Sequence, residues 1–286
     1  MIYVSSCSVR SKSIKESIVP LAEAGIKNIE LTGGSNFYPG YETDLLKLQD
    51  QFELNYLVHN YFPPPQKHFI LNLASLNDDT YKQSIEHCKK AIKACIRLES
   101  EKYGVHAGFL IDFSAAEVGK KISYRALNNR DEALKRFSDA WKILTDEAGS
   151  DVTLYIENNV FSSTNSETYK GENPFFLTDY ENYQELNENM KFNLLLDLAH
   201  LKVSASSLGL DFSQEASRML PLTDYVHISG NNGLHDQNFG LNSDSEIQIL
   251  LKETDLTDKT MTLEVYDGIE SVLNSINILH SLINKF

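Results

Sequence analysis

The sequence predicts a single (β/α)8 barrel, and three observations support this fold class. Short apolar runs rich in β-forming residues alternate with longer amphipathic stretches throughout the 286 residues. There are eight segments of each kind, which is the number that closes a barrel of parallel strands. No linker, low-complexity segment or shift in composition divides the chain, so residues 1–286 are expected to form one domain. An open, doubly wound sheet is the alternative arrangement of the same units.

The expected strands are short segments in which β-branched, aromatic and leucine residues concentrate. Their largely continuous apolar character is typical of parallel strands that are buried on both faces. In chain order they span residues 2–6, 27–32, 54–60, 101–107, 152–158, 192–197, 222–229 and 260–266.

The expected helices are the amphipathic segments between and after these strands. The stretch Asn77-Asp78-Asp79 is expected to supply capping side chains for the third helix, Gly25 to end the first, and Gly268 to open the turn into the last. The longest irregular segments, 61–72 and 158–176, each follow a strand and are expected to cover the rim where substrates bind. The helices are expected near residues 13–24, 42–52, 77–98, 128–147, 177–188, 206–219, 243–253 and 268–284.

Composition and charge narrow the functional classes. The chain is 42% hydrophobic and 23% charged, which is enough apolar material for a large core. It has no apolar run long enough to cross a membrane, and its first residues do not predict a signal peptide. The formal net charge of −14, without a basic cluster, lowers the expectation of a nucleic-acid partner. Three scattered cysteines predict neither disulfides nor a zinc module, so the expected compartment is the reducing cytoplasm, with a homo-oligomer left open.

Four consecutive expected strands deliver metal-ligand side chains near their carboxyl ends. Strand five ends at Glu157, strand six at Asp197 and strand seven near His227, and strand eight carries Glu264. Each carboxylate alone could cap a helix or pair with a lysine. In a parallel barrel, however, all four side chains lie on one rim, where three carboxylates would repel one another. The pattern therefore predicts one divalent cation, and oxygen-rich ligation with one imidazole suits Mn²⁺, Mg²⁺, Co²⁺ or Zn²⁺.

Other polar residues are expected at the same rim. His200 follows Asp197 by three residues, on the expected turn after strand six, and is directed either into the barrel mouth or to the surface. His59 ends strand three, His106 ends strand four and Glu30 lies on strand two, so all three are candidates for binding substrate. Three further histidines, which are expected to lie outside the site, are His68, His87 and His280.

At these residues the chain resembles the xylose isomerase-like barrel superfamily, which includes sugar isomerases, sugar epimerases and endonuclease IV. The resemblance covers nearly the whole chain but rests mainly on the motifs YIENN, LLLDLAH, VHISGNN and LEVY. It implies that Glu157, Asp197, His227 and Glu264 hold the metal ion. The Asp-x-x-His spacing is also the family's pattern, and it implies that His200 faces substrate or a further metal.

Different motifs of the chain resemble two branches of this superfamily. The stretches LVHNYF and GVHAG resemble the histidine-bearing strands of endonuclease IV, which implies a further zinc held by His59, His106 and Glu157. That enzyme follows its strand-seven His with Asp-x-His, whereas GLHDQNFG has His235 and Asp236 side by side. Its Arg-bearing segment after strand two is replaced here by TGGSNFYPG.

The sugar branch fits better, because KNIELTGG is similar to the Ile-Glu-Leu strand that is typical of its members. Gly233 stands where ketose 3-epimerases usually carry an Arg, six residues after the strand-seven His. The resemblance and the acidic charge together favour a sugar or sugar phosphate as the partner.

The sequence thus predicts a metal-dependent sugar or sugar-phosphate isomerase or epimerase that works through an enediolate. Glu157 and Glu264 are the expected proton-transfer groups, and His200 is expected to hydrogen-bond the substrate oxygen that gains charge. An endonuclease IV-like zinc phosphodiesterase acting on abasic DNA is the alternative enzyme, and a non-catalytic binding module is the third interpretation. The residues expected to bind substrate are Glu30, His59, His106, Asn232, His235 and Asp236.

Overall fold

Eight parallel strands close into a barrel in the computed structural model of the chain, which describes residues 1–117, 120–242 and 245–283. Each strand pairs with its neighbours in sequence, and β1 pairs with β8 to close the ring. This confirms the predicted (β/α)8 barrel and excludes the open sheet. The strands are β1 (Ile2–Ser5), β2 (Asn28–Leu31), β3 (Asn55–His59), β4 (Lys102–His106), β5 (Thr153–Glu157), β6 (Asn193–Asp197), β7 (Tyr225–Ile228) and β8 (Thr260–Leu263).

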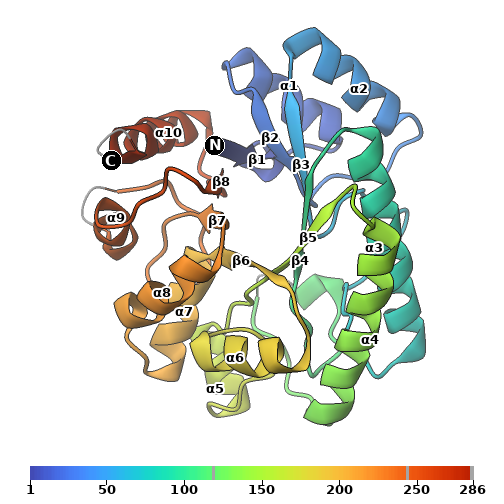
Figure 1. Cartoon of the computed structure of the whole chain (residues 1–286), viewed down its shortest axis with the longest axis vertical. Helices are drawn as coiled ribbons and strands as arrows, with labels where there is room; N and C mark the ends of the chain where they lie inside the picture. Colours follow the sequence, from blue (N-terminus) through green and yellow to red (C-terminus); the bar gives the residue numbers. More distant parts are fainter. Residues whose placement is uncertain (118–119, 243–244, 284–286) are drawn as a thin grey trace.

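The helices form an outer ring around the strands (Figure 1). None of the helices within the described residues is both long enough and apolar enough to cross a membrane. Positions 243, 244 and 284 of the expected helices lie outside the described residues. The helices are α1 (Ile14–Glu23), α2 (Tyr41–Phe52), α3 (Asp78–Arg97), α4 (Arg130–Ala148), α5 (Ser163–Tyr169), α6 (Tyr180–Asn189), α7 (Leu198–Leu208), α8 (Phe212–Met219), α9 (Glu246–Lys252) and α10 (Ile269–Ile283), with short 3₁₀ turns at η1 (Ser6–Ser8), η2 (Ala115–Glu117) and η3 (Leu220–Leu222).

Helix boundaries follow the capping chemistry of the sequence. The Asn77 side chain accepts hydrogen bonds from the backbone of Asp79 and Thr80, both at 3.0 Å, and so caps α3 as predicted. Gly25 follows α1 with φ +88°, and Gly268 precedes α10 with φ +111°. Both positions need the left-handed backbone that glycine adopts without strain.

Two stretches of helix differ from the prediction. The expected helix 206–219 is really α7 and α8, which Gly209 separates at φ +71°. α7 begins directly after β6 because Asp197 ends the strand and accepts the backbone N–H of His200 at 2.8 Å. The short helix α5 lies within the segment 158–176, which was expected to be irregular.

One layer of apolar side chains fills the barrel interior below the carboxyl ends of the strands. Successive residues of a strand face opposite sides, so each residue two positions farther along shares the inward direction. Tyr155, Leu195 and Tyr225 therefore place Glu157, Asp197 and His227 in the next layer of the barrel. The layer consists of Tyr3, Leu57, Tyr155, Leu195 and Tyr225.

Candidate active site

The four predicted metal ligands converge above this apolar layer. Glu157 and Asp197 are the last residues of β5 and β6, His227 lies in β7 opposite Asp197, and Glu264 follows β8 by one residue. Each offers a ligand atom, and these atoms all lie within 4.8 Å of one another. All four residues are buried. The rim geometry expected from the strand order is therefore present, while the metal-binding role stays a prediction.

Three of these side chains carry a buried polar atom that has no hydrogen-bond partner within the described part of the chain. The atoms are Glu157 Oε1, Asp197 Oδ2 and His227 Nδ1, of which Glu157 Oε1 and His227 Nδ1 lie 3.3 Å apart as an ion pair. A buried polar group without a partner costs about 1–3 kcal/mol, so such groups are rarely left unsatisfied. Their convergence, together with the carboxylate and imidazole chemistry, fits a divalent cation.

Burial and neighbouring groups shift the pKa values of the carboxyl groups in this cluster in opposite directions. Burial raises the pKa of Asp197 to about 6 and the pKa of Glu264 to about 7. Burial would also raise the pKa of Glu157, but the imidazoles of His106, His59 and His227 hold it well below its ordinary value. Glu157 therefore favours the ionised form, whereas Asp197 and Glu264 favour the protonated form more than free carboxyl groups do. General acid–base catalysis uses carboxyl groups whose pKa values differ in this way.

His59 and His106 form a second cluster around Glu157. His59 Nε2 lies 2.6 Å, and His106 Nδ1 3.2 Å, from Glu157 Oε2, and together the three residues could hold a further ion. Gly104 makes room for this arrangement, because a Cβ there would lie 2.7 Å from Leu195 Cδ2 and 3.1 Å from His59 Cδ2. Burial lowers the pKa of His106 to about 4, and the neighbouring Glu157 carboxylate opposes this shift.

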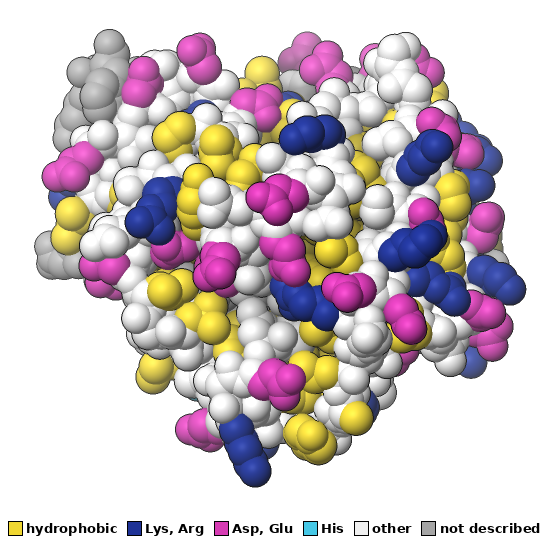
Figure 2. All heavy atoms as spheres, turned by 60° about the horizontal axis from the view of Figure 1, so that its bottom comes forward, with side chains coloured by type: hydrophobic (Ala, Val, Ile, Leu, Met, Phe, Trp, Pro, Cys, Tyr) yellow, Lys and Arg dark blue, Asp and Glu magenta, His cyan; other side chains and the backbone are white. Residues whose placement is uncertain are grey.

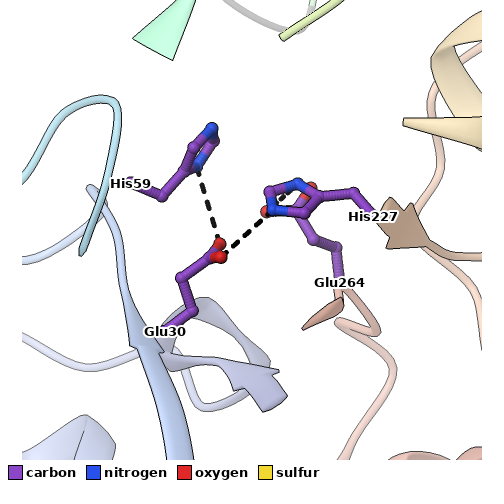
Figure 3. Close-up of side chains that lie close together, drawn as sticks. All are labelled: Glu30, His59, His227 and Glu264. Atoms are coloured by element: carbon purple, nitrogen blue, oxygen red, sulfur yellow. Dashed lines mark hydrogen bonds and ion pairs between the residues drawn. The ribbon is translucent and has the colours of Figure 1, made fainter. Parts of the chain in front are cut away.

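Glu30 lies between two imidazoles at the base of the cluster (Figure 3). Its Oε2 accepts hydrogen bonds from the Tyr225 hydroxyl, from His227 Nε2 at 3.1 Å and from Thr262 Oγ1 at 2.8 Å. Its Oε1 is 3.8 Å from His59 Nδ1. The carboxylate therefore holds the proton of His227 on Nε2, which leaves Nδ1 free as a ligand atom. Glu30 is fully buried, and its predicted contact with substrate remains untested.

His200 lies in the first turn of α7, so the expectation of a turn at this position was wrong. Its Nδ1–H donates to the Asn158 carbonyl at 2.9 Å, and its Nε2 lies 3.4 Å from Asp236 Oδ2. Burial opposes a charged ring, but Asp197 and Asp236 raise the pKa of His200 well above its ordinary value. The Asn158 amide also bonds the backbone of Asp197 through both of its polar atoms, at 2.7 and 3.0 Å. It thereby fixes the ends of β5 and β6.

A cavity of about 850 Å³ opens above the strand ends, and His106 and His200, which contact the metal-ligand cluster, are among the residues that line it. His235 and Asp236 line it, as predicted for substrate-binding positions. Asn232 is exposed, and its side chain accepts the backbone N–H groups of Leu234 and His235, which shapes the loop. His68 also lines the cavity, contrary to the expectation that it lies outside the site. Its position depends on the conformation of a loop, which the sequence pattern does not reveal.

Comparison with known families gave a match over nearly the whole chain. A family model described as xylose isomerase-like TIM barrel matches residues 19–281. A search of curated protein sequences gave no match.

Several solved structures share the fold at low sequence identity, which demonstrates similarity of fold alone. A D-tagatose 3-epimerase-like protein superposes with TM-score 0.73 at 18% identity, covering 99% of this chain and 98% of the other. The TTHB071 protein from Thermus thermophilus, soaked with ZnCl2, gives TM-score 0.65 at 17% identity, with coverage of 100% and 98%. Endonuclease IV from the same organism gives 0.62 at 14% identity, with coverage of 100% and 99%.

Proposed function

Because the chain belongs to the xylose isomerase-like TIM barrel family, we propose that it is a divalent-metal-dependent isomerase or epimerase of a sugar or sugar phosphate. The observation that carries the proposal is the convergence of Glu157, Asp197, His227 and Glu264 within 4.8 Å. The unpartnered buried atoms of three of these residues support a bound cation, Mn²⁺, Mg²⁺, Co²⁺ or Zn²⁺. When bound, such an ion polarises a carbonyl and stabilises the enediolate formed on proton removal.

The proton transfers fall to the two glutamates. Glu157 is the stronger candidate for the base, because the surrounding imidazoles keep its carboxylate ionised. Glu264, which lies in the same cluster, is the candidate for the group that returns the proton, and its burial favours the protonated form more than the surroundings of Glu157 do. Two carboxyl groups with opposite protonation tendencies provide the acid and the base that an epimerisation or isomerisation needs.

His200 is the candidate donor to the substrate oxygen that gains negative charge. Its Nδ1–H is committed to the Asn158 carbonyl, which orients the ring and directs Nε2 toward Asp236, a residue that lines the cavity. Because the adjacent carboxylates favour the imidazolium, Nε2 carries a proton that can be donated.

Exchange of substrate hydrogen with ²H2O tests this function. We expect the metal-loaded protein to exchange one C–H of a substrate found in a panel of ketoses, aldoses and their phosphates. Glu264→Gln should reduce the exchange at least about 100-fold, the lower end of what general acid–base catalysis contributes. Glu270→Gln, which changes an exposed glutamate of α10, is the matched control and should leave exchange unchanged. Failure of every sugar to exchange in the metal-loaded protein would contradict the proposal.

The cluster of His59 and His106 on Glu157 favours one second candidate, a zinc phosphodiesterase of the endonuclease IV kind. Against this candidate, the formal net charge of the chain is −14, and Figure 2 shows Lys and Arg side chains mixed with Asp and Glu on one face of the molecule. A protein that binds duplex DNA usually neutralises several phosphates with Lys and Arg side chains. The Asp-x-His pattern of endonuclease IV would require a His two residues after Asp236, and this position is Asn238, whose side chain is an amide and not an imidazole. Cleavage of an abasic-site duplex by the wild type, lost in His59→Ala, would favour this second candidate over the first.

A further inference from the structure

Glu264 depends on a single hydrogen bond for the orientation of its side chain. Among the residues that the structure describes, the Tyr266 hydroxyl is the only group that hydrogen-bonds this carboxylate, at 3.2 Å from Oε1. His227 Nδ1 lies farther from the same oxygen, at 3.9 Å. Each of the other three proposed metal ligands has an orienting contact of its own. These contacts join His59 to Glu157, the backbone N–H of His200 to Asp197, and Glu30 to His227.

The alternation of residues 261–266 places Glu264 and Tyr266 on the same side of the backbone. Residues two positions apart in an extended segment point to the same side. Leu263 and Val265 belong to the large apolar core. Thr262 points the other way, because its hydroxyl donates to the buried Glu30 at 2.8 Å. The order of residues after Thr262 therefore brings a phenol next to the proposed proton-transfer carboxylate.

The backbone that carries this pair is held by the segment after β7, although β8 itself ends at Leu263. The Glu264 N–H donates to the Ile228 carbonyl at 3.1 Å. The Tyr266 N–H donates to the Asn238 carbonyl at 2.8 Å. Because both backbone positions are hydrogen-bonded, the Tyr266 hydroxyl is preorganised beside Glu264.

The neighbours of the Tyr266 hydroxyl leave its proton for Glu264. This hydroxyl also interacts with the side chains of Ser5 and Cys7. The Cys7 thiol donates to the Gly33 carbonyl at 2.9 Å, and its sulfur is a weaker acceptor than a carboxylate oxygen. A serine O–H can donate to the phenolic oxygen while the phenolic O–H donates elsewhere. The phenolic proton is therefore directed to Glu264 Oε1.

We propose that Tyr266 is a positioning residue that orients the Glu264 carboxylate. Glu264 retains 6% exposure, whereas Glu157, Asp197 and His227 have none, so its orientation is the least restricted by packing. A hydroxyl that holds one carboxylate oxygen limits rotation of the group, which then needs no ordering before it serves as a metal ligand or transfers a proton. This inference rests on the proposed function, because it concerns a ligand of that site.

Metal titration of Tyr266→Phe tests the inference, because this variant removes the hydroxyl and keeps the ring. Competitive titrations of the metal-free protein are carried out with Zn²⁺ and with Mn²⁺. We expect Tyr266→Phe to weaken the affinity for both ions about tenfold or more, as is typical when the partner of a metal ligand is lost. Tyr81→Phe is the matched control and should keep the wild-type affinity. The Tyr81 hydroxyl, which is also on a partly buried residue, donates to the Arg136 carbonyl at the same 3.2 Å, on α3 and away from the site.

A double-mutant cycle tests whether Tyr266 acts through Glu264. Its remaining members are Glu264→Ala and the combination of Glu264→Ala with Tyr266→Phe. Three protein ligands remain in this background, which is enough to bind a zinc ion. Tyr266→Phe should cost less than about threefold in Zn²⁺ affinity once Glu264 is replaced. A tyrosine that only supported the fold would cost the same in both backgrounds.

The outcomes separate this inference from the proposed function. Wild-type metal affinity in Tyr266→Phe, or an equal loss of Zn²⁺ affinity in both backgrounds of the cycle, would overturn the inference. Sugar exchange by the wild type would in that case leave the proposed function standing. Metal binding that depends on Tyr266 through Glu264, without exchange of any sugar, would support the inference and contradict the proposed function. A wild type that binds neither ion would contradict both.

Discussion

Asp197→Asn tests the proposed metal-binding role of the buried Asp197 side chain separately from its role as a helix cap. Asp197 Oδ1 accepts the backbone N–H of His200 at 2.8 Å and so caps α7, while Oδ2 has no hydrogen-bond partner within the described residues. Asn keeps an oxygen for the cap but replaces the second oxygen with an N–H2 group, which cannot ligate a cation. The substitution therefore removes a proposed ligand and leaves the helix cap intact.

The substitution should change metal affinity much more than it changes the stability of the metal-free protein. Loss of a residue that only supports a metal ligand typically costs 10–100-fold in affinity, so loss of a direct ligand should exceed about 100-fold, or about 2.7 kcal/mol. Asn and Asp cap helices about equally well, so the cap should contribute less than about 0.5 kcal/mol to any change in the metal-free free energy of unfolding. Burial raises the pKa of Asp197 to about 6, so the ionised carboxylate is disfavoured in the folded protein at neutral pH, and a neutral amide there should raise metal-free stability rather than lower it.

The assay is competitive metal titration, combined with urea unfolding of the metal-free protein. Asp211→Asn provides a matched control, because Asp211 caps α8 by accepting the backbone N–H of Gln214 at 2.8 Å away from the site. It should leave metal affinity unchanged. Wild-type metal affinity in Asp197→Asn, or a loss of stability above about 2 kcal/mol in its metal-free form, would refute the reasoning and make Asp197 a structural residue.

Two further predictions concern protons and ligand orientation. Burial raises the pKa of Asp197 to about 6 and of Glu264 to about 7, so a cation that binds these carboxylates should displace their protons. Metal affinity should therefore increase from about pH 5 to 8. A metal affinity that calorimetry finds to be independent of pH would contradict this prediction. These two carboxyls bind protons more tightly in the folded than in the unfolded chain, so their contribution to metal-free stability should fall as pH rises from about 4 to 7. Glu30→Gln should weaken metal binding about tenfold by loosening the Nε2–H bond that orients His227, and it should lower metal-free thermal stability because the buried carboxylate is stabilised by its imidazole neighbours. Unchanged metal affinity would show that Glu30 does not orient this ligand.

The strand-end residues could be found from sequence because the carboxyl ends of parallel strands share one rim. Neighbouring strands bring Asp197 opposite His227 and His106 opposite Glu157, which follows from strand order and length alone. The role of Glu30 could not be found in the same way. A strand buried on both faces gives no alternation of polar and apolar residues to indicate which side chains point inward.

The start of α7 and the aromatic lining of the cavity could not be predicted from the sequence, for different reasons. The start of α7 was hidden because Leu198 and the residues after it continue the apolar run of β6. The aromatic lining of the cavity depends on contacts between distant loops, such as the backbone bridge of Phe109 with Phe175 and the hydrogen bonds between the Asn72 side chain and the backbone of Phe109. Such loop contacts have no repeating period, so no pattern in the sequence predicts them.

The central claim is the metal centre, and anomalous diffraction from crystals soaked separately with Mn²⁺ and Zn²⁺ tests it most directly. The account predicts one ion bound by Glu157, Asp197, His227 and Glu264 at distances of roughly 2.0–2.3 Å. A second, well-occupied ion on His59 and Glu157 would shift the balance toward the phosphodiesterase. Absence of any anomalous peak among the four side chains, at ion concentrations that saturate other sites in the same crystals, would contradict the account.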